Sequence, residues 1–153
     1  PPRSTLFPYT TLFRSKGRTV LIGVIESVAK RSARVMTVLN PEFRISAALP
    51  DSGAVGFLNA GQEPGWDGSG AAVGFLPANR TFALNEPLLT TGFEPLVPED
   101  ILIGYLGSIE SAALPFGNRL YRGGTLRPAA DFARLGAVTV ALPAPEKSPE
   151  DGR

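Results

Sequence analysis

The sequence predicts an all-β protein, built from short antiparallel strands with one short helix near the C-terminus. The chain has 153 residues, of which 17 are glycine and 15 are proline, and so many turn-forming residues leave little room for long helices. Several segments between them alternate in polarity at every second residue, which is typical of half-buried strands. Other segments are short apolar runs rich in β-branched residues, as in buried strands.

Three strands are expected in the first third of the chain. Residues 20–28 are mostly β-branched and apolar, and residues 34–39 alternate. Residues 43–49 place four apolar side chains on one face, namely Phe43, Ile45, Ala47 and Leu49. We expect these three segments to pair as consecutive antiparallel strands.

A five-residue repeat predicts the next two strands. The sequence Ala-Val-Gly-Phe-Leu occupies residues 54–58 and returns at 72–76, after a glycine-rich segment, 59–71, that contains Trp66. We expect a hairpin with a long loop, and the central glycines predict a bulge or a tight barrel bend. Residues 65–70 lack the Lys-Ser/Thr pair of a phosphate-binding loop and no long helix follows them, so we interpret them as a loop tip.

The rest of the chain predicts further strands and an unstructured tail. Apolar and alternating runs that end at Gly or Pro indicate strands at 86–91, 101–109, 120–126 and 137–142. Residues 144–153 are polar and proline-rich and contain no core residues, so we expect a disordered tail.

The only helix candidate is residues 128–135. Pro128 suits the first turn of a helix, Asp131 favours its positive N-terminal end, and Gly136 ends it. Residues three apart share a helix face, so we expect Phe132 and Leu135 to pack inward beneath the last strand.

Residues 1–15 are interpreted as an artefact that does not belong to the natural protein. Each of these residues agrees with one reading frame of a common sequencing-library adapter, and such scars are excluded from fold reasoning. We therefore expect residues 1–15 to be disordered and the natural N-terminus to be lost. Without Arg3 and Arg14 the formal net charge falls from +1 to −1, so no basic footprint for nucleic acid remains.

The composition excludes the common catalytic and metal sites. The chain has no Cys and no His, which removes disulfides, thiolate sites, Ser-His-Asp triads and His-ligated metals. The carboxylate pairs Glu99-Asp100 and Glu150-Asp151 fall between strands and in the tail, where exposed charge is the simpler interpretation. The three lysines, Lys16, Lys30 and Lys147, lie in ends or turns, and the basic cluster around Lys30 reads as a solvated turn. The sequence therefore predicts no catalytic, cofactor-binding or metal-binding residue and no enzyme.

Five segments resemble one known family. They are the strand 20–28, the Ser-to-Pro segment 32–41, the Leu-Leu-Thr-Thr-Gly turn 88–92, the Ile-Leu-Ile-Gly strand 101–104 and the Arg-Pro-Ala-Ala-Asp block 127–135. In order and spacing they are similar to the C-terminal β domain of the rod-shape-determining protein MreC, over roughly residues 20–142. The Pro-Ala-Ala-Asp block is the most specific part. Mild departures make this a divergent relative, because Asn40, Thr91 and the Glu99-Asp100 pair replace residues that are common in the family.

The resemblance implies two small antiparallel β-barrels, with residues 16–42 a remnant of a truncated first barrel and residues 43–143 the second. It implies a non-enzymatic, extracytoplasmic scaffold of the bacterial cell-elongation machinery that acts in cell shape and peptidoglycan synthesis. Its partners would be class B penicillin-binding proteins and other membrane proteins of that machinery, with possible self-association, and membrane anchoring would come from a lost N-terminal segment. In this interpretation Thr90, Thr91, Gly92, Pro128 and Asp131 are structural. The alternative is a secreted β-barrel that binds a ligand or glycan through the loop around Trp66.

Overall fold

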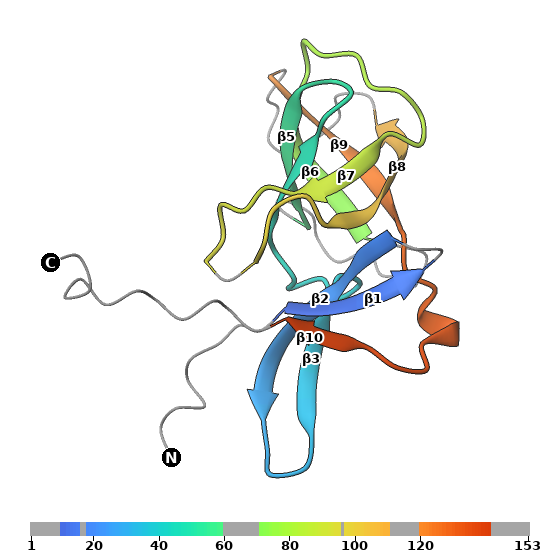
Figure 1. Cartoon of the computed structure of the whole chain (residues 1–153). Helices are drawn as coiled ribbons and strands as arrows, with labels where there is room; N and C mark the ends of the chain where they lie inside the picture. The colour runs from blue at the N-terminus through green and yellow to red at the C-terminus, as the bar shows by residue number, and fades with distance from the viewer. Residues whose placement is uncertain (1–9, 16–17, 60–70, 96, 111–119, 142–153) are drawn as a thin grey trace, which may run out of the picture.

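The structure is a computed structural model that describes residues 10–15, 18–59, 71–95, 97–110 and 120–141. The described residues form ten strands and a single turn of 3-10 helix, so the all-β prediction is confirmed (Figure 1). The elements are β1 (Thr10–Ser15), β2 (Arg18–Val28), β3 (Ala33–Thr37), β4 (Ser46–Leu49), β5 (Ala54–Leu58), β6 (Ala71–Pro77), β7 (Pro87–Thr90), β8 (Leu102–Glu110), β9 (Tyr121–Pro128), η2 (Phe132–Arg134) and β10 (Thr139–Ala141).

Six of the strands close into an antiparallel barrel. Strand β4 pairs with β5, β5 with β6, β6 with β9, β9 with β8, β8 with β7, and β7 returns to β4. Closure satisfies the backbone groups along both edges of each strand within the ring, which is what removes exposed edges from a sheet. The prediction of a small antiparallel barrel is therefore confirmed.

The barrel interior holds the residues that the two-residue period places inward. Phe43 is only 1% exposed, and the other three predicted inward residues are also buried. The three larger side chains, Phe43, Ile45 and Leu49, each contribute roughly 1.5–3 kcal/mol of transfer free energy when fully buried. The same cluster receives side chains from the other barrel strands, among them Leu58, Val73, Leu76, Leu88, Ile103, Leu106 and Leu126.

A smaller open sheet lies against one end of the barrel. Its order is β10-β1-β2-β3, and β2 also meets β8 of the barrel through one parallel pair, Val20 with Leu102. A second apolar cluster joins the two parts, and it consists of Val20, Ile22, Leu102 and Ala130. This sheet holds most of residues 16–42, the segment that we assigned to the first barrel.

One predicted strand pairing is wrong. Residues 34–39 and 43–49 do not pair with each other, because β3 pairs with β2 whereas β4 pairs with β5 and β7. Strand β10 falls within residues 43–143, which we assigned to the second barrel, and it pairs with β1 in the small sheet. Alternation along a strand fixes which face is buried, but it carries no information on which strand lies beside it.

The prediction that residues 1–15 are disordered is wrong for Thr10–Ser15. These residues form β1, which pairs with β2 from Thr10 with Val24 to Ser15 with Arg18, and with β10 on its other side. The sequence Thr-Thr-Leu-Phe has strong strand propensity, and β2 offers a row of backbone donors and acceptors beside it. The rest of the segment, residues 1–9, and the predicted tail, 144–153, lie outside the described residues.

The predicted helix is shorter than expected. Pro128 is the last residue of β9, paired with Gly104, and Ala129 N donates a hydrogen bond to Ile103 O. The ladder therefore holds this end of the segment extended, and only η2 is helical. Phe132 and Leu135 are half-buried against the cluster that joins sheet and barrel, so their inward packing is confirmed in part.

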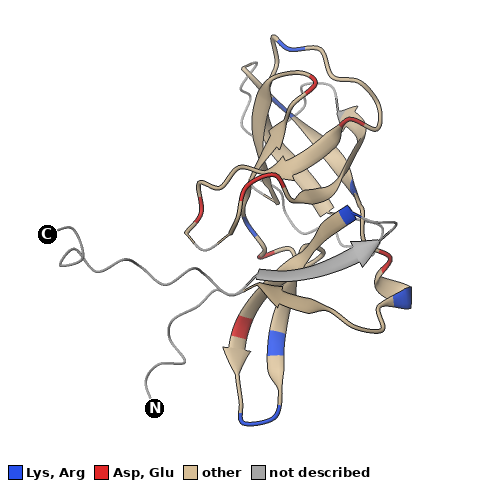
Figure 2. Ribbon diagram, viewed as in Figure 1, with Lys and Arg blue, Asp and Glu red and all other residues tan. Residues whose placement is uncertain are grey.

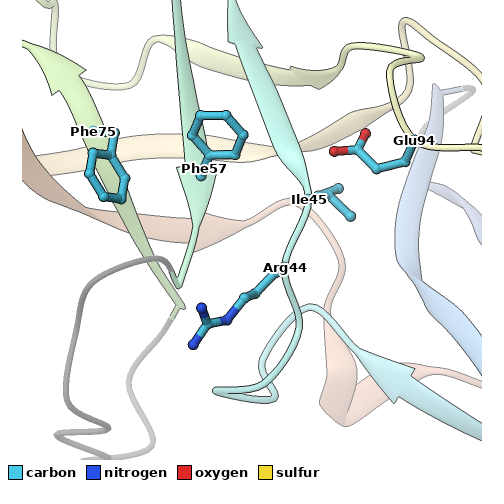
Figure 3. Close-up of a pocket in the computed structure, with 5 residues that line it drawn as sticks. All are labelled: Arg44, Ile45, Phe57, Phe75 and Glu94. Carbon is cyan, nitrogen blue, oxygen red and sulfur yellow. The ribbon is translucent and has the colours of Figure 1, made fainter.

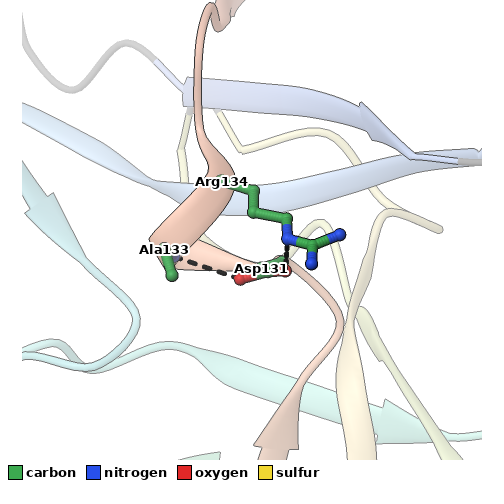
Figure 4. A network of polar contacts seen from close by, with 3 residues as sticks. All are labelled: Asp131, Ala133 and Arg134. Atoms are coloured by element: carbon green, nitrogen blue, oxygen red, sulfur yellow. Dashed lines mark hydrogen bonds and ion pairs between the residues drawn. The ribbon is translucent and has the colours of Figure 1, made fainter.

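Asp131, which was predicted to favour the start of the helix, is the N-cap of η2. Its Oδ1 accepts a hydrogen bond from Ala133 N at 3.1 Å, and Arg134 lies 3.6 Å from its other oxygen (Figure 4). We expect Asp131→Ala to lower the free energy of unfolding by about 0.5–1 kcal/mol, mainly through loss of the cap, because exposed ion pairs contribute little. Urea denaturation measures this, with Asp131→Asn as a control that keeps the acceptor oxygen. A loss in Asp131→Asn equal to that in Asp131→Ala would contradict the cap.

Candidate protein-binding surface

One outer face of the barrel carries exposed aromatic rings. Along β5, the residues Ala54, Gly56 and Leu58 are buried, whereas Val55 and Phe57 are 38% and 44% exposed. Position 56 requires a glycine, because a Cβ added there would lie 2.8 Å from the side chain of Leu76 and 2.9 Å from that of Val73. The pattern of β5 therefore sends its largest side chain outward rather than into the core.

A β-bulge turns a second ring to the same face. Ala71 and Val73 point inward on β6, so an unbroken alternation would send Phe75 inward as well. The register with β9 shifts between Val73 and Leu76, and Phe75 has a positive φ of 57°, so Leu76 is buried and Phe75 is 39% exposed. The bulge expected at the central glycines of the repeat is thus confirmed at Gly74, whereas β5 pairs with β4 at Gly56 without a register shift. The bulge in β6 decides which ring is exposed.

Three rings from neighbouring strands form the feature that we call the aromatic ladder: Phe57, Phe75 and Tyr121. The ring centres of Phe57 and Phe75 are 6.3 Å apart with planes at 87°, and those of Phe75 and Tyr121 are 5.6 Å apart at 73°. Both contacts are edge-to-face, which is favourable for aromatic pairs. Tyr121 is 37% exposed, so each ring keeps a substantial area for a partner.

An open hollow of about 410 Å³ adjoins the ladder (Figure 3). Ile45 is buried at its floor, Phe57 and Phe75 stand on one side, and Arg44 and Glu94 supply charge. The volume falls in the range of ligand pockets, roughly 300–1,000 Å³, but the lining has few polar groups that converge on one point. The hollow is better suited to an apolar side chain of a protein than to a small polar ligand.

Glu94 is held in place from one side. Its Oε1 accepts hydrogen bonds from Ser46 N at 2.6 Å and from Ser46 Oγ at 2.7 Å, and Ser46 Oγ is also 2.5 Å from Thr91 Oγ1. Its Oε2 is buried and has no hydrogen-bond partner. The network therefore ties the start of β4 to the β7–β8 loop, residues 91–101, and fixes the polar edge of the hollow.

Only some of the residues considered for catalysis lie in the part of the chain that the structure describes. Glu99 and Asp100 are exposed, as is Lys30, whereas Lys16, Lys147, Glu150, Asp151 and Trp66 lie outside the described residues. Among the residues that the structure describes, no group of three or more carboxylates could hold a metal ion. In the same part of the chain, no helix is long and apolar enough to cross a membrane.

The sequence alone did not identify the aromatic ladder. The alternation within the repeat could have marked Phe57 as outward-facing. Phe75 could not be placed, because its direction depends on the bulge, and Tyr121 joins the ladder only through the long-range pairing of β6 with β9. Thr90, Thr91 and Asp131 have the structural roles predicted for them, since their side chains bond to neighbouring backbone or side-chain groups.

Comparisons with known proteins agree on one family. The family model described as the barrel core of rod shape-determining protein MreC matches residues 11–142. The MreC structure from Listeria monocytogenes superposes with a TM-score of 0.71 at 22% identity, and that from Pseudomonas aeruginosa with 0.66 at 14%. The matches cover 90% and 92% of this chain, and 62% and 83% of theirs, so this chain spans less than two thirds of the Listeria protein.

A third structure shows the same fold inside an assembly. It is a complex between the penicillin-binding protein PBP2 and MreC from Helicobacter pylori, with a TM-score of 0.55 and 15% identity over 80% of this chain and 68% of that one. No curated protein sequence matches the chain. At these identities the solved structures establish the fold, and the family model carries the assignment.

Proposed function

Because the chain belongs to the MreC family, whose barrel-core model matches residues 11–142, we propose that it is a non-enzymatic scaffold of the bacterial cell-elongation machinery. In this role it acts outside the cytoplasmic membrane, in cell shape and peptidoglycan synthesis, by binding other proteins. The observation that carries the proposal is the exposed aromatic ladder beside the apolar hollow.

The proposed partner is a class B penicillin-binding protein. The Helicobacter pylori neighbour, which shares the fold, was solved in complex with the penicillin-binding protein PBP2. Exposed aromatic residues that are backed by a rigid barrel are typical anchors of protein interfaces, because their rings bury a large area at a low cost in conformational entropy. The partner would place an apolar side chain in the hollow and cover the ladder around it.

The test measures binding of the elongation-specific penicillin-binding protein from the same genome to the chain. We expect Phe57→Ala/Tyr121→Ala to weaken binding by at least about thirtyfold, since even one central aromatic anchor contributes about 2 kcal/mol or more when truncated. Loss of the two edge-to-face contacts should lower the unfolding free energy by about 1–3 kcal/mol, so circular dichroism is used to check that the variant is still folded. Leu84→Ala is the control, because Leu84 is 74% exposed on the β6–β7 loop and is not part of the ladder.

Two outcomes would contradict the proposal. A wild-type chain that is folded and fails to bind the penicillin-binding protein would favour the alternative of a ligand- or glycan-binding barrel. Turnover in peptidase or esterase assays that is lost on replacing one Ser or Thr would overturn the non-enzymatic part. An unchanged affinity in the double variant would leave the partner class standing and move the contact away from the ladder.

A further inference from the structure

The tip of the β2–β3 hairpin, residues 26–34, extends beyond the rest of the small sheet. Pairing of β2 with β1 ends at Val24, and the last buried residue of β2 is Ile25. Every residue of the hairpin tip is exposed. The tip points away from the barrel (Figure 1). No described part of the chain covers it, so it is accessible to a partner outside the molecule.

Backbone hydrogen bonds order the hairpin tip up to its last turn. The ladder between the strands continues to the pair of Val28 with Ala33. Beyond this pair, Ala29 N donates a hydrogen bond to Ser32 O at 2.7 Å, and only residues 30–31 lie between them. A tip that is already ordered loses little further conformational entropy when it binds.

Positive charge gathers at the hairpin tip (Figure 2). Lys30, Arg31 and Arg34 lie there with a single acid, Glu26, so the tip has a formal charge of +2, whereas the whole chain has +1. In the described part of the chain, none of these three cations forms an ion pair. Unpaired, exposed cations of one sign attract an anionic surface.

Apolar side chains lie next to these cations. Val28 is 46% exposed, and its cross-strand neighbour Ala33 is exposed as well. Directly paired residues share one face of a hairpin, so Val28 and Ala33 form a small apolar face close to Lys30 and Arg31. The hairpin tip has no aromatic ring on which a nucleic-acid base could stack. Cations beside a small apolar face fit an anionic lipid surface better than a nucleic acid.

We infer that the hairpin tip binds the surface of an anionic lipid bilayer. Lys30 and Arg31 would contact the phosphate groups of the lipid headgroups, and Val28 would enter the boundary between headgroups and acyl chains. Each Lys or Arg close to an anionic bilayer strengthens binding about fivefold. Three cations and one valine therefore give a weak and reversible contact rather than a stable anchor.

This contact would orient the protein on a membrane. The hairpin tip points away from the barrel that carries the aromatic ladder, so a bilayer at the tip leaves the ladder uncovered (Figure 1). The inference goes beyond the proposed function and does not depend on it, because lipid binding needs no penicillin-binding protein.

Co-sedimentation of the full chain with lipid vesicles tests the contact. We expect binding to vesicles that contain phosphatidylglycerol and none to vesicles of phosphatidylcholine alone, which have no net charge. Lys30→Glu/Arg31→Glu should weaken binding at least about 25-fold, about fivefold for each cation lost. Arg80→Glu/Arg134→Glu is the matched control, because it changes the net charge equally at exposed positions outside the tip. Its binding should be almost unchanged, and circular dichroism checks that both variants are folded.

A dye at position 28 tests whether the apolar face enters the lipid. The chain contains no Cys, so Val28→Cys creates a single site for an environment-sensitive label. Its emission should shift to the blue on phosphatidylglycerol vesicles. The same label in Leu84→Cys, at a residue that is 74% exposed on the β6–β7 loop, should show no shift. Unlabelled Val28→Ser should bind at least about fourfold more weakly, the effect of one methylene group buried in lipid.

Glycerol phosphate, which is the headgroup without acyl chains, distinguishes a lipid surface from a site for free phosphate. At equal ionic strength it should not displace the chain from the vesicles, and displacement would overturn the inference in favour of a phosphate site. Binding that Lys30→Glu/Arg31→Glu leaves unchanged would also overturn it, because the contact would then lie on cations outside the tip. So would a wild-type chain that fails to bind phosphatidylglycerol vesicles at an ionic strength of about 0.01 M, where the Debye length is about 30 Å and attraction is strongest.

Discussion

Replacing Phe43 with alanine will lower the free energy of unfolding by about 3–5 kcal/mol, the usual cost of truncating a buried phenylalanine. Phe43 is 1% exposed and is among the largest fully buried side chains in the described part of the barrel. Its backbone is also fixed, because Phe43 N donates to Asn40 O at 2.9 Å and Phe43 O accepts from Asn59 Nδ2 at 2.9 Å. The surrounding strands form a closed ring, so they can relax only partly into the cavity.

Phe93→Ala is the matched control for this substitution. It removes the same atoms from a side chain that is 75% exposed, so the unfolding free energy should change by less than about 0.5 kcal/mol. Urea denaturation gives both values, and equal m-values would show that the extent of unfolding is unchanged. A loss below about 1 kcal/mol in Phe43→Ala would mean that the barrel collapses around the cavity, and the tight packing described above would then be wrong.

The features that were predicted correctly from the sequence depend on residues that are close together along the chain. The alternation from Phe43 to Leu49 correctly identified the inward face of β4, because the side-chain period of a strand is local. The repeat located β5 and β6, and its central glycine located the bulge next to Phe75. Asp131 was correctly expected to favour the start of the helix for the same reason, since the hydrogen bond it accepts comes from a residue only two positions away.

The errors all concern contacts between segments far apart in the sequence. The alternation in 137–142 does not reveal that β10 pairs with β1 rather than with the barrel. The adapter match over residues 1–15 led us to expect disorder, but strand formation by Thr10–Ser15 requires only a free edge and suitable propensity. The aromatic ladder was missed because three strands must be in register before its rings meet.

Gly23 shows how a motif residue of the sequence acquires a physical role in the structure. It is the glycine of the Val-Leu-Ile-Gly run in β2, and it is buried where β1 and β3 both pair with that strand. A Cβ added there would overlap Met36 O and would lie 2.8 Å from Met36 C and from Thr37 Cα. All three are backbone atoms, which cannot rotate aside as the end of a side chain can.

Gly23→Ala should therefore separate β2 from β3 and cost about 3 kcal/mol, the upper end of the usual range for overpacking. Gly136→Ala is the matched control, because an added Cβ at Gly136 meets nothing within 4 Å, and its unfolding free energy should be almost unchanged. The loss of stability in Gly23→Ala should be accompanied by faster proteolysis of the hairpin tip at residues 26–34. The β2–β3 pairs at the base of this hairpin would open first. If Gly23→Ala were as stable as Gly136→Ala, β3 could move away from β2 at no cost. The close approach of the two strands would then not explain the glycine at position 23.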